Sequence, residues 1–339
     1  MLTTLKSGLY LGIDTGATRT EATITKETGL VIGIGEAGTA NLHNVSIETA
    51  FNNIKVAVEE AKKDLKSKQP ETSINEFEAA CLGISGLDTV ADKERLKTFF
   101  NGLTGDDQTL GSKILIIANN GLTGLMSGTE NPYGICLIAA TGSNCYGVSK
   151  TGRETSSGNW GYFLGDQGSA FAIGQALLRL AMKEFDGRLP QTAITHKILD
   201  YLNLADAGQI VGWAYRETLP VREIAGLSKL IDDDDLSNIV DIAEITNQTV
   251  RELINAYRAV IDRLEIDLTN PFPVVLVGGL FSMKNNFIEK VESSILGITP
   301  QAAVVKNQRS ISEGAARIAM LHNYMRLFPE SLIVIVRPS

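Results

Sequence analysis

The 339-residue sequence contains little cysteine and little histidine, with three residues of each. The cysteines are Cys81, Cys136 and Cys145, and no C-x-x-C pair occurs. The number is odd, and each cysteine lies in an apolar or small-residue run. This pattern predicts reduced, buried thiols in a cytoplasmic protein rather than disulfides, and it argues against a His/Cys metal site.

Long hydrophobic runs and excess positive charge are also missing. The apolar segments at 9–13 and 332–336 are too short for a signal-peptide core or a membrane span, and we expect the second to be an edge strand. The formal net charge is -8. An acidic chain repels polyanions, so neither nucleic acid nor a membrane surface is an expected partner. An ATP site would then depend on backbone N–H groups and a metal ion.

The common phosphate-binding loop is absent, because no G-x-x-x-x-G-K-[ST] segment occurs. Gly33, Gly35 and Gly38 do match G-x-G-x-x-G, which in a dinucleotide-binding fold opens directly into a helix. Here the next predicted helix begins several residues later. We therefore interpret these glycines as part of a strand followed by a turn.

The chain is long enough for two domains, and 44% of its residues are hydrophobic, which allows a large core. Apolar periodicity predicts a mixed α/β order that begins twice. The first series is expected to comprise strands at 9–14, 20–25 and 31–37, a helix at 47–66, a strand at 77–84, a helix at 90–100 and a strand at 113–118. The second is expected to comprise strands at 134–140 and 145–148, helices at 169–185, 191–202 and 236–264, a strand at 273–277, a further helix, a strand at 302–306 and a helix at 312–324.

Each series opens with a strand, a turn of small and hydroxyl residues, and a second strand. The segments are LYLGIDTGATRTEATITKETG and ICLIAATGSNCYGVSKTGRET. Their likeness indicates an internal duplication, although a match this short can also arise by chance. Small residues let backbone N–H groups approach an anion, and Asp14 could hold Mg²⁺ beside a phosphate. The alternative is two ordinary hairpin turns.

A strand end at 274–277 is followed by Gly278 and Gly279. Two glycines allow the backbone to approach a flat ring closely, which is suitable for adenine. The alternative is a plain connection from a strand to a helix.

Five segments together resemble the N-acetylglucosamine kinase branch of the BadF/BadG-type ATPase family, which is part of the actin, hexokinase and Hsp70 superfamily. They are GIDTGATRTEA, ISGLD, AATGSNCYG, GNWGYFLGDQGSA and VLVGGLF. The resemblance extends from Leu9 to about Tyr324. It implies duplicated ribonuclease-H-like (actin-like ATPase) α/β domains with ATP and an amino sugar in the cleft between them. The expected lobes are 1–122, completed by a C-terminal helix at about 312–339, and 123–311 with a helical insertion. It also implies a homodimer.

The same resemblance implies roles for individual residues. Contacts with ATP are expected from Asp14, Gly16, Thr18, Arg19, Thr141, Gly142, Ser143, Gly278 and Gly279. Contacts with the sugar are expected from Asn41, Ser143, Asn144, Trp160, Gly161 and Asp166. Asp14 is the expected Mg²⁺ ligand, and Trp160 could alternatively be a buried anchor.

One position departs from the family pattern. Where the family usually carries the aspartate that takes the proton from the sugar hydroxyl, this chain has Asn120. An amide can bind a hydroxyl but cannot accept its proton. Gln167 likewise follows Asp166 where the family often has glutamate. Three explanations stay open: an engineered base knockout, a naturally degenerate member, or deamidation of Asn120 before Gly121.

The sequence thus predicts an ATP-dependent sugar kinase that converts a hexosamine, N-acetylglucosamine, to its 6-phosphate with Asn120 and Asp14 at the catalytic centre. Its activity is expected to be lowered by Asn120. The alternative is a non-catalytic protein that binds ATP and sugar. A third class in the same family, ATPases that energise a radical enzyme, uses cysteine-ligated clusters, and three scattered cysteines do not fit it.

Overall fold

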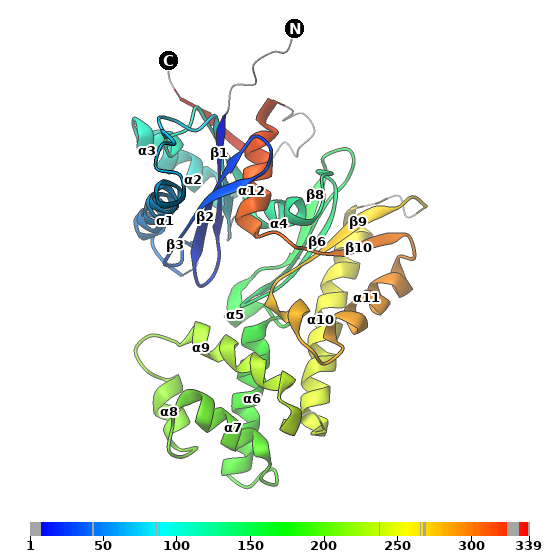
Figure 1. Cartoon of the computed structure of the whole chain (residues 1–339). Helices are drawn as coiled ribbons and strands as arrows, with labels where there is room; N and C mark the ends of the chain where they lie inside the picture. The colour runs from blue at the N-terminus through cyan, green and yellow to red at the C-terminus, as the bar shows by residue number, and fades with distance from the viewer. Residues whose placement is uncertain are drawn as a thin grey trace.

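The structure is a computed structural model that describes residues 8–42, 44–85, 87, 89–236, 238–264, 266, 269–323 and 332–337. Within these residues the chain forms two β-sheets with helices around them, so the expected α/β class is confirmed. The strand order is β11-β5-β4-β1-β2-β3 in the first sheet and β10-β9-β6-β7-β8 in the second. Figure 1 shows the first sheet at the upper left, the second to its right and a helical region below.

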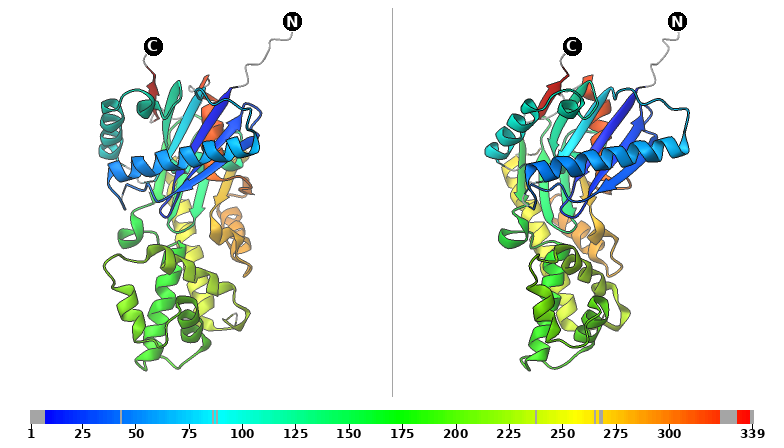
Figure 2. Two further views of the ribbon diagram at one scale, coloured as in Figure 1. Left: turned by 60° about the vertical axis from the view of Figure 1, so that its left-hand side comes forward. Right: turned by 90° about the vertical axis from the view of Figure 1, so that its left-hand side faces the viewer.

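The first sheet and its outer helices come mainly from the first third of the chain. They are β1 (Leu9–Thr15), β2 (Thr20–Lys26), β3 (Val31–Ala37), α1 (Ile47–Lys68), β4 (Ala79–Ile84), α2 (Val90–Gly102), α3 (Asp106–Thr109), β5 (Ile114–Asn119) and the edge strand β11 (Ile333–Val336). Helix α1 crosses one face of this sheet (Figure 2). The helix packs closely because Gly35 of β3 has no side chain. A Cβ at this position would lie 2.2 Å from the Ala57 carbonyl oxygen. The G-x-G-x-x-G match therefore belongs to a strand, as interpreted from the sequence.

The second sheet is formed by β6 (Gly134–Ala139), β7 (Ser143–Val148), β8 (Glu154–Gly158), β9 (Phe272–Val277) and β10 (Ala302–Lys306). Its strand pairing repeats that of the first sheet. In both, the opening hairpin is antiparallel, and its first strand also pairs in parallel with the fourth strand of the series. This repeated pairing confirms the internal duplication, and it brings the two hairpin turns to equivalent places in their sheets.

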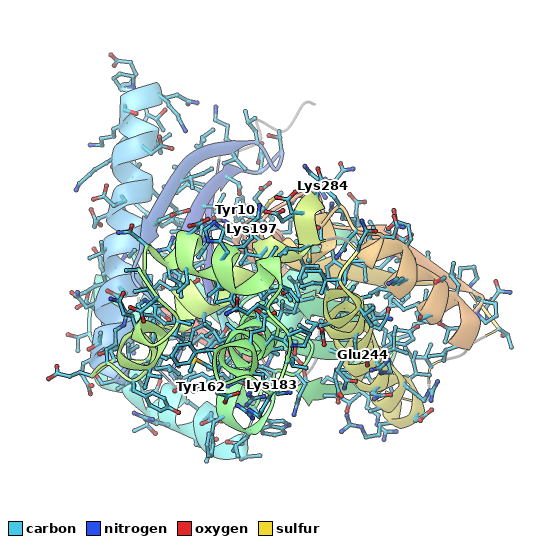
Figure 3. The ribbon with its side chains drawn as sticks, turned by 90° about the horizontal axis from the view of Figure 1, so that it is seen from below. Tyr10, Tyr162, Lys183, Lys197, Glu244 and Lys284 are labelled. Atoms are coloured by element: carbon cyan, nitrogen blue, oxygen red, sulfur yellow. The ribbon has the colours of Figure 1, made fainter. Side chains whose placement is uncertain are left out.

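The remaining helices cover the sheets or extend from them. They are α4 (Asn120–Gly128), α5 (Gly161–Leu164), α6 (Ala170–Phe185), α7 (Ala193–Leu202), α8 (Gln209–Ala214), α9 (Val221–Gly226), α10 (Val240–Leu264), α11 (Phe287–Ile298) and α12 (Ile311–Met320), with short 3-10 turns at Leu227–Asp232, Asp234–Leu236 and Gly279–Ser282. Helices α6 to α9 lie nearest the viewer in Figure 3. There Lys197 pairs with Asp233 and Asp235 at 2.9 and 2.7 Å, which fastens α7 to the turn before α10.

Helices α4 and α12 lie between the sheets and pack on each other (Figure 1). The sequence of α4, NGLTGLMSG, has three glycines and little helical propensity. A Cβ at Gly121 would lie 2.4 Å from Tyr146, and one at Gly124 would lie 2.8 Å from Cys136. This helix therefore forms because it fits a narrow space, which propensity alone does not reveal.

Most expected elements are present, with bounds shifted by a few residues. The sequence did not predict α4 or β8, whose polar segment ETSSG has no apolar alternation. The predicted helix at 236–264 begins four residues late, after a 3-10 turn. Helix α12 ends at Met320, and the predicted end at Tyr324 lies outside the described residues. The three cysteines are free and buried, as expected.

A search of the described helices for one long and apolar enough to cross a bilayer finds none.

Candidate active site

A single cavity is bordered by the turns of both opening hairpins. Its lining contains most of the residues that the sequence singled out, namely Asp14, Gly16, Thr18, Arg19, Asn41, Asn120, Thr141, Gly142, Ser143, Asn144, Gly161 and Asp166. These residues come from parts of the chain more than 100 positions apart. The duplicated pairing is what brings the two turns to one place.

Three predicted residues lie elsewhere. Gly278 and Gly279 follow β9 and are not among the described residues that border this cavity. Gly278 does require glycine: its φ is +121°, and a Cβ there would lie 2.3 Å from the Ala139 carbonyl oxygen. Trp160 borders an adjoining groove together with Gln167 and Asn144. Its exposed fraction is 58%, so the alternative of a buried anchor is wrong.

Asp14 lies near the end of β1, directly opposite Glu21 of β2. Opposite residues of an antiparallel pair project from the same face, so the two carboxylates are neighbours. Burial, and then the charge of Glu21, raises the pKa of Asp14 from its ordinary 3.8 to about 7, while Arg19 acts in the other direction. Its Oδ1 atom is buried and finds no hydrogen-bond donor in the part of the chain that the structure describes. Such an atom is suited to a cation or donor from a ligand.

The turn of the second hairpin is held by the segment that follows β8. Ser143 donates its backbone N–H to Asp166 Oδ1 at 3.3 Å. Gly142 makes this approach possible, because a Cβ there would lie 2.8 Å from Asp166 Oδ2. Asp166 itself has φ +60°, an uncommon backbone conformation for a residue with a side chain. The Asp166 carboxylate is therefore held against the second hairpin turn, and the strained backbone of Asp166 is the conformational cost.

Asn120 is the first residue of α4, and its side chain is buried. Its Nδ2 donates to Ser85 Oγ at 2.7 Å, and the Ser85 N–H donates to Thr15 Oγ1 at 3.1 Å. With Nδ2 held in this way, Asn120 Oδ1 is left buried and without a donor from the described chain. The position therefore offers a hydrogen-bond acceptor to a ligand but no group that takes up a proton.

Amides dominate the rest of the cavity. Among the described residues, the lining includes five asparagines, Asn41, Asn44, Asn120, Asn144 and Asn159, but two carboxylates and one guanidinium. Both polar side-chain atoms of Asn144 are buried with no partner among the described residues. Amides both donate and accept, as sugar hydroxyls do, so this lining is suited to a neutral ligand rich in hydroxyl groups.

Sequence reasoning missed several lining residues, including Ser85, Asn44, Asn159 and Tyr162. Ser85 could have been found, because it follows β4, and β4 pairs in parallel with β1 so that Ile84 lies beside Thr15. Polar residues just after parallel strands gather at one edge of a sheet. Asn44 and Asn159 lie in connecting segments and Tyr162 in the short helix α5, whose positions the sequence does not define. Within the ISGLD segment, Gly86 and Asp88 lie outside the described residues.

The raised pKa of Asp14 predicts an unusual pH dependence of folding. A carboxyl group whose pKa is higher in the folded state weakens folding once it ionises. The free energy of unfolding contributed by Asp14 is therefore expected to be highest below pH 4 and to fall as the pH rises from about 4 to 7. The loss should be on the order of 4 kcal/mol. Urea unfolding of the wild type and of Asp14→Asn across this range, without nucleotide, measures the difference. If the difference in unfolding free energy between the two proteins did not change with pH, the raised pKa of Asp14 would be wrong.

Comparison with known proteins identifies relatives of the chain over most of its length. Residues 11–319 match the BadF/BadG/BcrA/BcrD ATPase family. The chain is 29% identical to an N-acetyl-D-glucosamine kinase of Dictyostelium discoideum, covering 92% of this chain and 98% of the relative. It is 27% identical to an N-acetylmuramic acid/N-acetylglucosamine kinase of Clostridium acetobutylicum, covering 91% and 97%.

Solved structures support the fold. A structure described as a putative N-acetylglucosamine kinase, from Chromobacterium violaceum, superposes with a TM-score of 0.70 at 21% identity, covering 91% of this chain and 98% of that one. A ROK family glucokinase from Streptomyces griseus superposes with a TM-score of 0.54 at 15% identity, covering 93% and 99%. The duplicated α/β fold agrees with these superpositions, and the match over residues 11–319 shows that the chain belongs to the BadF/BadG/BcrA/BcrD ATPase family.

Proposed function

We propose that the protein is an ATP-dependent sugar kinase that transfers the γ-phosphoryl group to a hydroxyl of a hexosamine, with N-acetylglucosamine as acceptor and its 6-phosphate as product. One observation carries the proposal: both hairpin turns and Asp14 border the same cavity as the amide-rich sugar-side residues. The names of the relatives support the choice of acceptor.

On the nucleotide side, the turns containing Gly16 and Gly142 supply backbone N–H groups to the phosphates, and Thr18, Thr141 and Ser143 add hydroxyl donors. Arg19 supplies a cationic side chain to the lining and is proposed to face the terminal phosphate. Gly278 and Gly279 are proposed to contact adenosine, although they lie beyond this cavity. Hydrogen-bond donors held in place around the phosphate oxygens stabilise the charge of the transition state, and this is the main source of rate acceleration in phosphoryl transfer.

The residues present fit a magnesium ion. Asp14 offers a buried carboxylate oxygen without a partner, and Mg²⁺ in kinases is held by one or two carboxylates together with substrate phosphates. A site of this kind does not need a cluster of protein ligands, and the described residues contain no group of three acidic, histidine or cysteine side chains. When bound, the ion would neutralise phosphate charge. Asp14 would hold it and would itself become ionised.

On the sugar side, Asn41, Asn144, Gly161 and Asp166 are proposed to bind the acceptor, with Trp160 joining from the adjoining groove. A carboxylate can take two sugar hydroxyls at once, and the amides can both donate and accept. A site built from such groups discriminates against analogues that leave one of them without a partner.

At Asn120 the proposed reaction lacks its usual proton acceptor. The Ser85 bond orients the amide so that Oδ1 can accept a hydrogen bond from the acceptor hydroxyl. The proton must then leave to water as the oxygen–phosphorus bond forms. Because phosphoryl transfer has a loose transition state, positioning and charge still accelerate it, and we expect slow turnover rather than none.

Deamidation is a poor explanation for recovered activity. It requires the Gly121 nitrogen to attack the Asn120 side chain. That N–H instead donates to Asn119 Oδ1 at 2.8 Å, and Asn120 and Gly121 are both buried in the first turn of α4. Gly121 is explained by packing, since a Cβ there would collide with Tyr146. An unchanged peptide mass at Asn120 in active protein is the expected result.

The alternative function is binding of ATP and sugar without transfer, and the orphaned amide oxygen of Asn120 favours it. A coupled ADP-release assay with N-acetylglucosamine, glucosamine, glucose and N-acetylmuramic acid tests both. We expect N-acetylglucosamine to raise ADP release above the background and a sugar 6-phosphate to form. Calorimetric binding of sugar and nucleotide with no product would favour the alternative, and no sugar binding at all would contradict both.

Two further expectations stay predictions. One is the homodimer. The other is the division into lobes at 1–122 with 312–339 and at 123–311, which gains support from the placement of β11 in the first sheet and of α12 against β1.

A further inference from the structure

Helix α12 comes from the end of the chain, yet its first turn reaches the phosphate side of the cavity. Ile311 borders the cavity, and Ser312 is fully buried beside β1 and β2. The contact is close because Gly12 has no side chain: a Cβ there would lie 2.0 Å from the Ser312 carbonyl. The position of this serine is therefore fixed by backbone packing.

The Ser312 hydroxyl has three oxygen neighbours. It lies 2.6 Å from Glu21 Oε1, 2.6 Å from Thr23 Oγ1 and 2.8 Å from Ser310 Oγ. An ionised carboxylate only accepts, so the single Ser312 proton points to Glu21, and the other two hydroxyls donate to Ser312. Ser310 can do so because its oxygen already accepts the Glu313 N–H as the cap of α12. The direction of each hydrogen bond is thus determined.

Glu21 divides its two oxygens between this helix and the cavity. Oε1 accepts from Ser312, and Oε2 lies 3.3 Å from Arg19 Nη2. The Glu21 side chain is only 13% exposed, and it lies opposite Asp14 in the strand pair. A carboxylate held on one side by a buried hydroxyl has little freedom on the other. Arg19 Nη1 also donates to Glu36 Oε1 at 2.5 Å, so Ser312 acts on the second of two carboxylate contacts that orient Arg19.

We propose that Ser312 is a positioning residue for the bound nucleotide: through Glu21 it holds Arg19, and the neighbouring Asp14, in the arrangement that receives the MgATP phosphates. This inference rests on the proposed function for the identity of the ligand. It assigns no contact between Ser312 and ATP. It also gives α12 a role that sequence motifs do not indicate.

The test is calorimetric titration of full-length protein with MgATP and, separately, with N-acetylglucosamine. Ser312→Ala should raise the Kd of MgATP about tenfold and leave the Kd of the sugar within about twofold, because only the phosphate side is disturbed. The matched control is Thr23→Val, which removes a buried hydroxyl that also contacts Ser312 but keeps the Ser312–Glu21 bond. Its Kd for MgATP should stay within about twofold of the wild type.

A double-mutant cycle shows whether the effect passes through Glu21. In a Glu21→Ala background, Ser312→Ala should cause no further change in the Kd of MgATP. If Ser312→Ala folds poorly, Ser312→Cys keeps an unbranched side chain with a longer and much weaker donor, and it has the same expected result.

The inference is overturned if Ser312→Ala binds MgATP like the wild type, if Thr23→Val weakens binding equally, or if the sugar Kd rises in parallel. Wild-type protein that binds MgATP but forms no sugar phosphate would refute the proposed kinase function and leave this inference standing. Wild-type protein that binds no MgATP would refute both.

Discussion

Asn120→Asp should increase the kcat for sugar phosphorylation by about 10²–10⁴, the usual contribution of a general base. The new carboxylate would occupy the first position of α4, where Asn120 Oδ1 is buried and has no partner among the described residues. Ser85 can reverse its role and donate its hydroxyl proton to the carboxylate, so the side chain keeps its support. Steady-state kinetics with MgATP and N-acetylglucosamine measure the change, and the KM of the sugar should change little.

Asn119→Asp is the matched control for this increase. It adds the same charge one residue earlier, at the cap of α4, where the side chain contacts Leu87 and Gly121 and does not border the cavity. It should give no increase in kcat. An Asn120→Asp protein that folds, binds both substrates and shows the wild-type kcat would mean that this position is not the site of proton transfer.

Asp14→Asn should lower kcat by at least about 10³ while making the nucleotide-free protein more stable above pH 7. The activity falls because the only buried carboxylate oxygen proposed for Mg²⁺ is replaced by an amide, a weak ligand for this ion. The stability rises because an ionised group with a pKa near 7 no longer has to be buried next to Glu21. Turnover as a function of Mg²⁺ concentration and urea unfolding at pH 8 measure the two effects.

Asp166→Asn is the control that distinguishes loss of the proposed Mg²⁺ ligand Asp14 from loss of any carboxylate in the cavity. Asp166 borders the same cavity, where its Oδ1 accepts the backbone N–H of Ser143, and an asparagine oxygen can keep this bond. Its replacement should raise the KM of the sugar and leave the Mg²⁺ dependence unchanged. If Asp14→Asn kept Mg²⁺-dependent turnover within tenfold of the wild type, the proposed metal site would be wrong.

The hairpins were predictable because each carries its signal locally. Short apolar runs define the strands that lead to Asp14 and Thr141, and small residues define the turns, so neighbouring positions suffice to recognise them. Repetition of that pattern then predicted the duplicated topology that the two sheets display. Residues placed by these turns, such as Gly16 and Ser143, were accordingly found at the cavity.

Elements held by distant contacts were harder to predict. Helix α4 has glycines where a helix usually has alanine or leucine, because Tyr146, Cys136 and Val275 occupy the space beside it. Strand β8 is polar because it is an edge strand that pairs with β7 alone. In the sequence, Ser312 is an ordinary serine in the first turn of a helix. Its contacts with Gly12 and Glu21, about 300 residues earlier, appear only in the folded chain.

The local sequence therefore predicted the α/β class, the duplication and two hairpin turns of small residues, since each pattern lies in residues adjacent in the chain, and it places an amide at position 120. Three-dimensional packing decided the rest: that both turns border one cavity, that Asp14 is paired with Glu21 and has a raised pKa, that Ser85 directs the Asn120 oxygen, and that Trp160 lies outside. The physical reason is that burial, charge proximity and hydrogen-bond direction depend on atoms brought together by folding, whose separation in sequence carries no information about their distance in space.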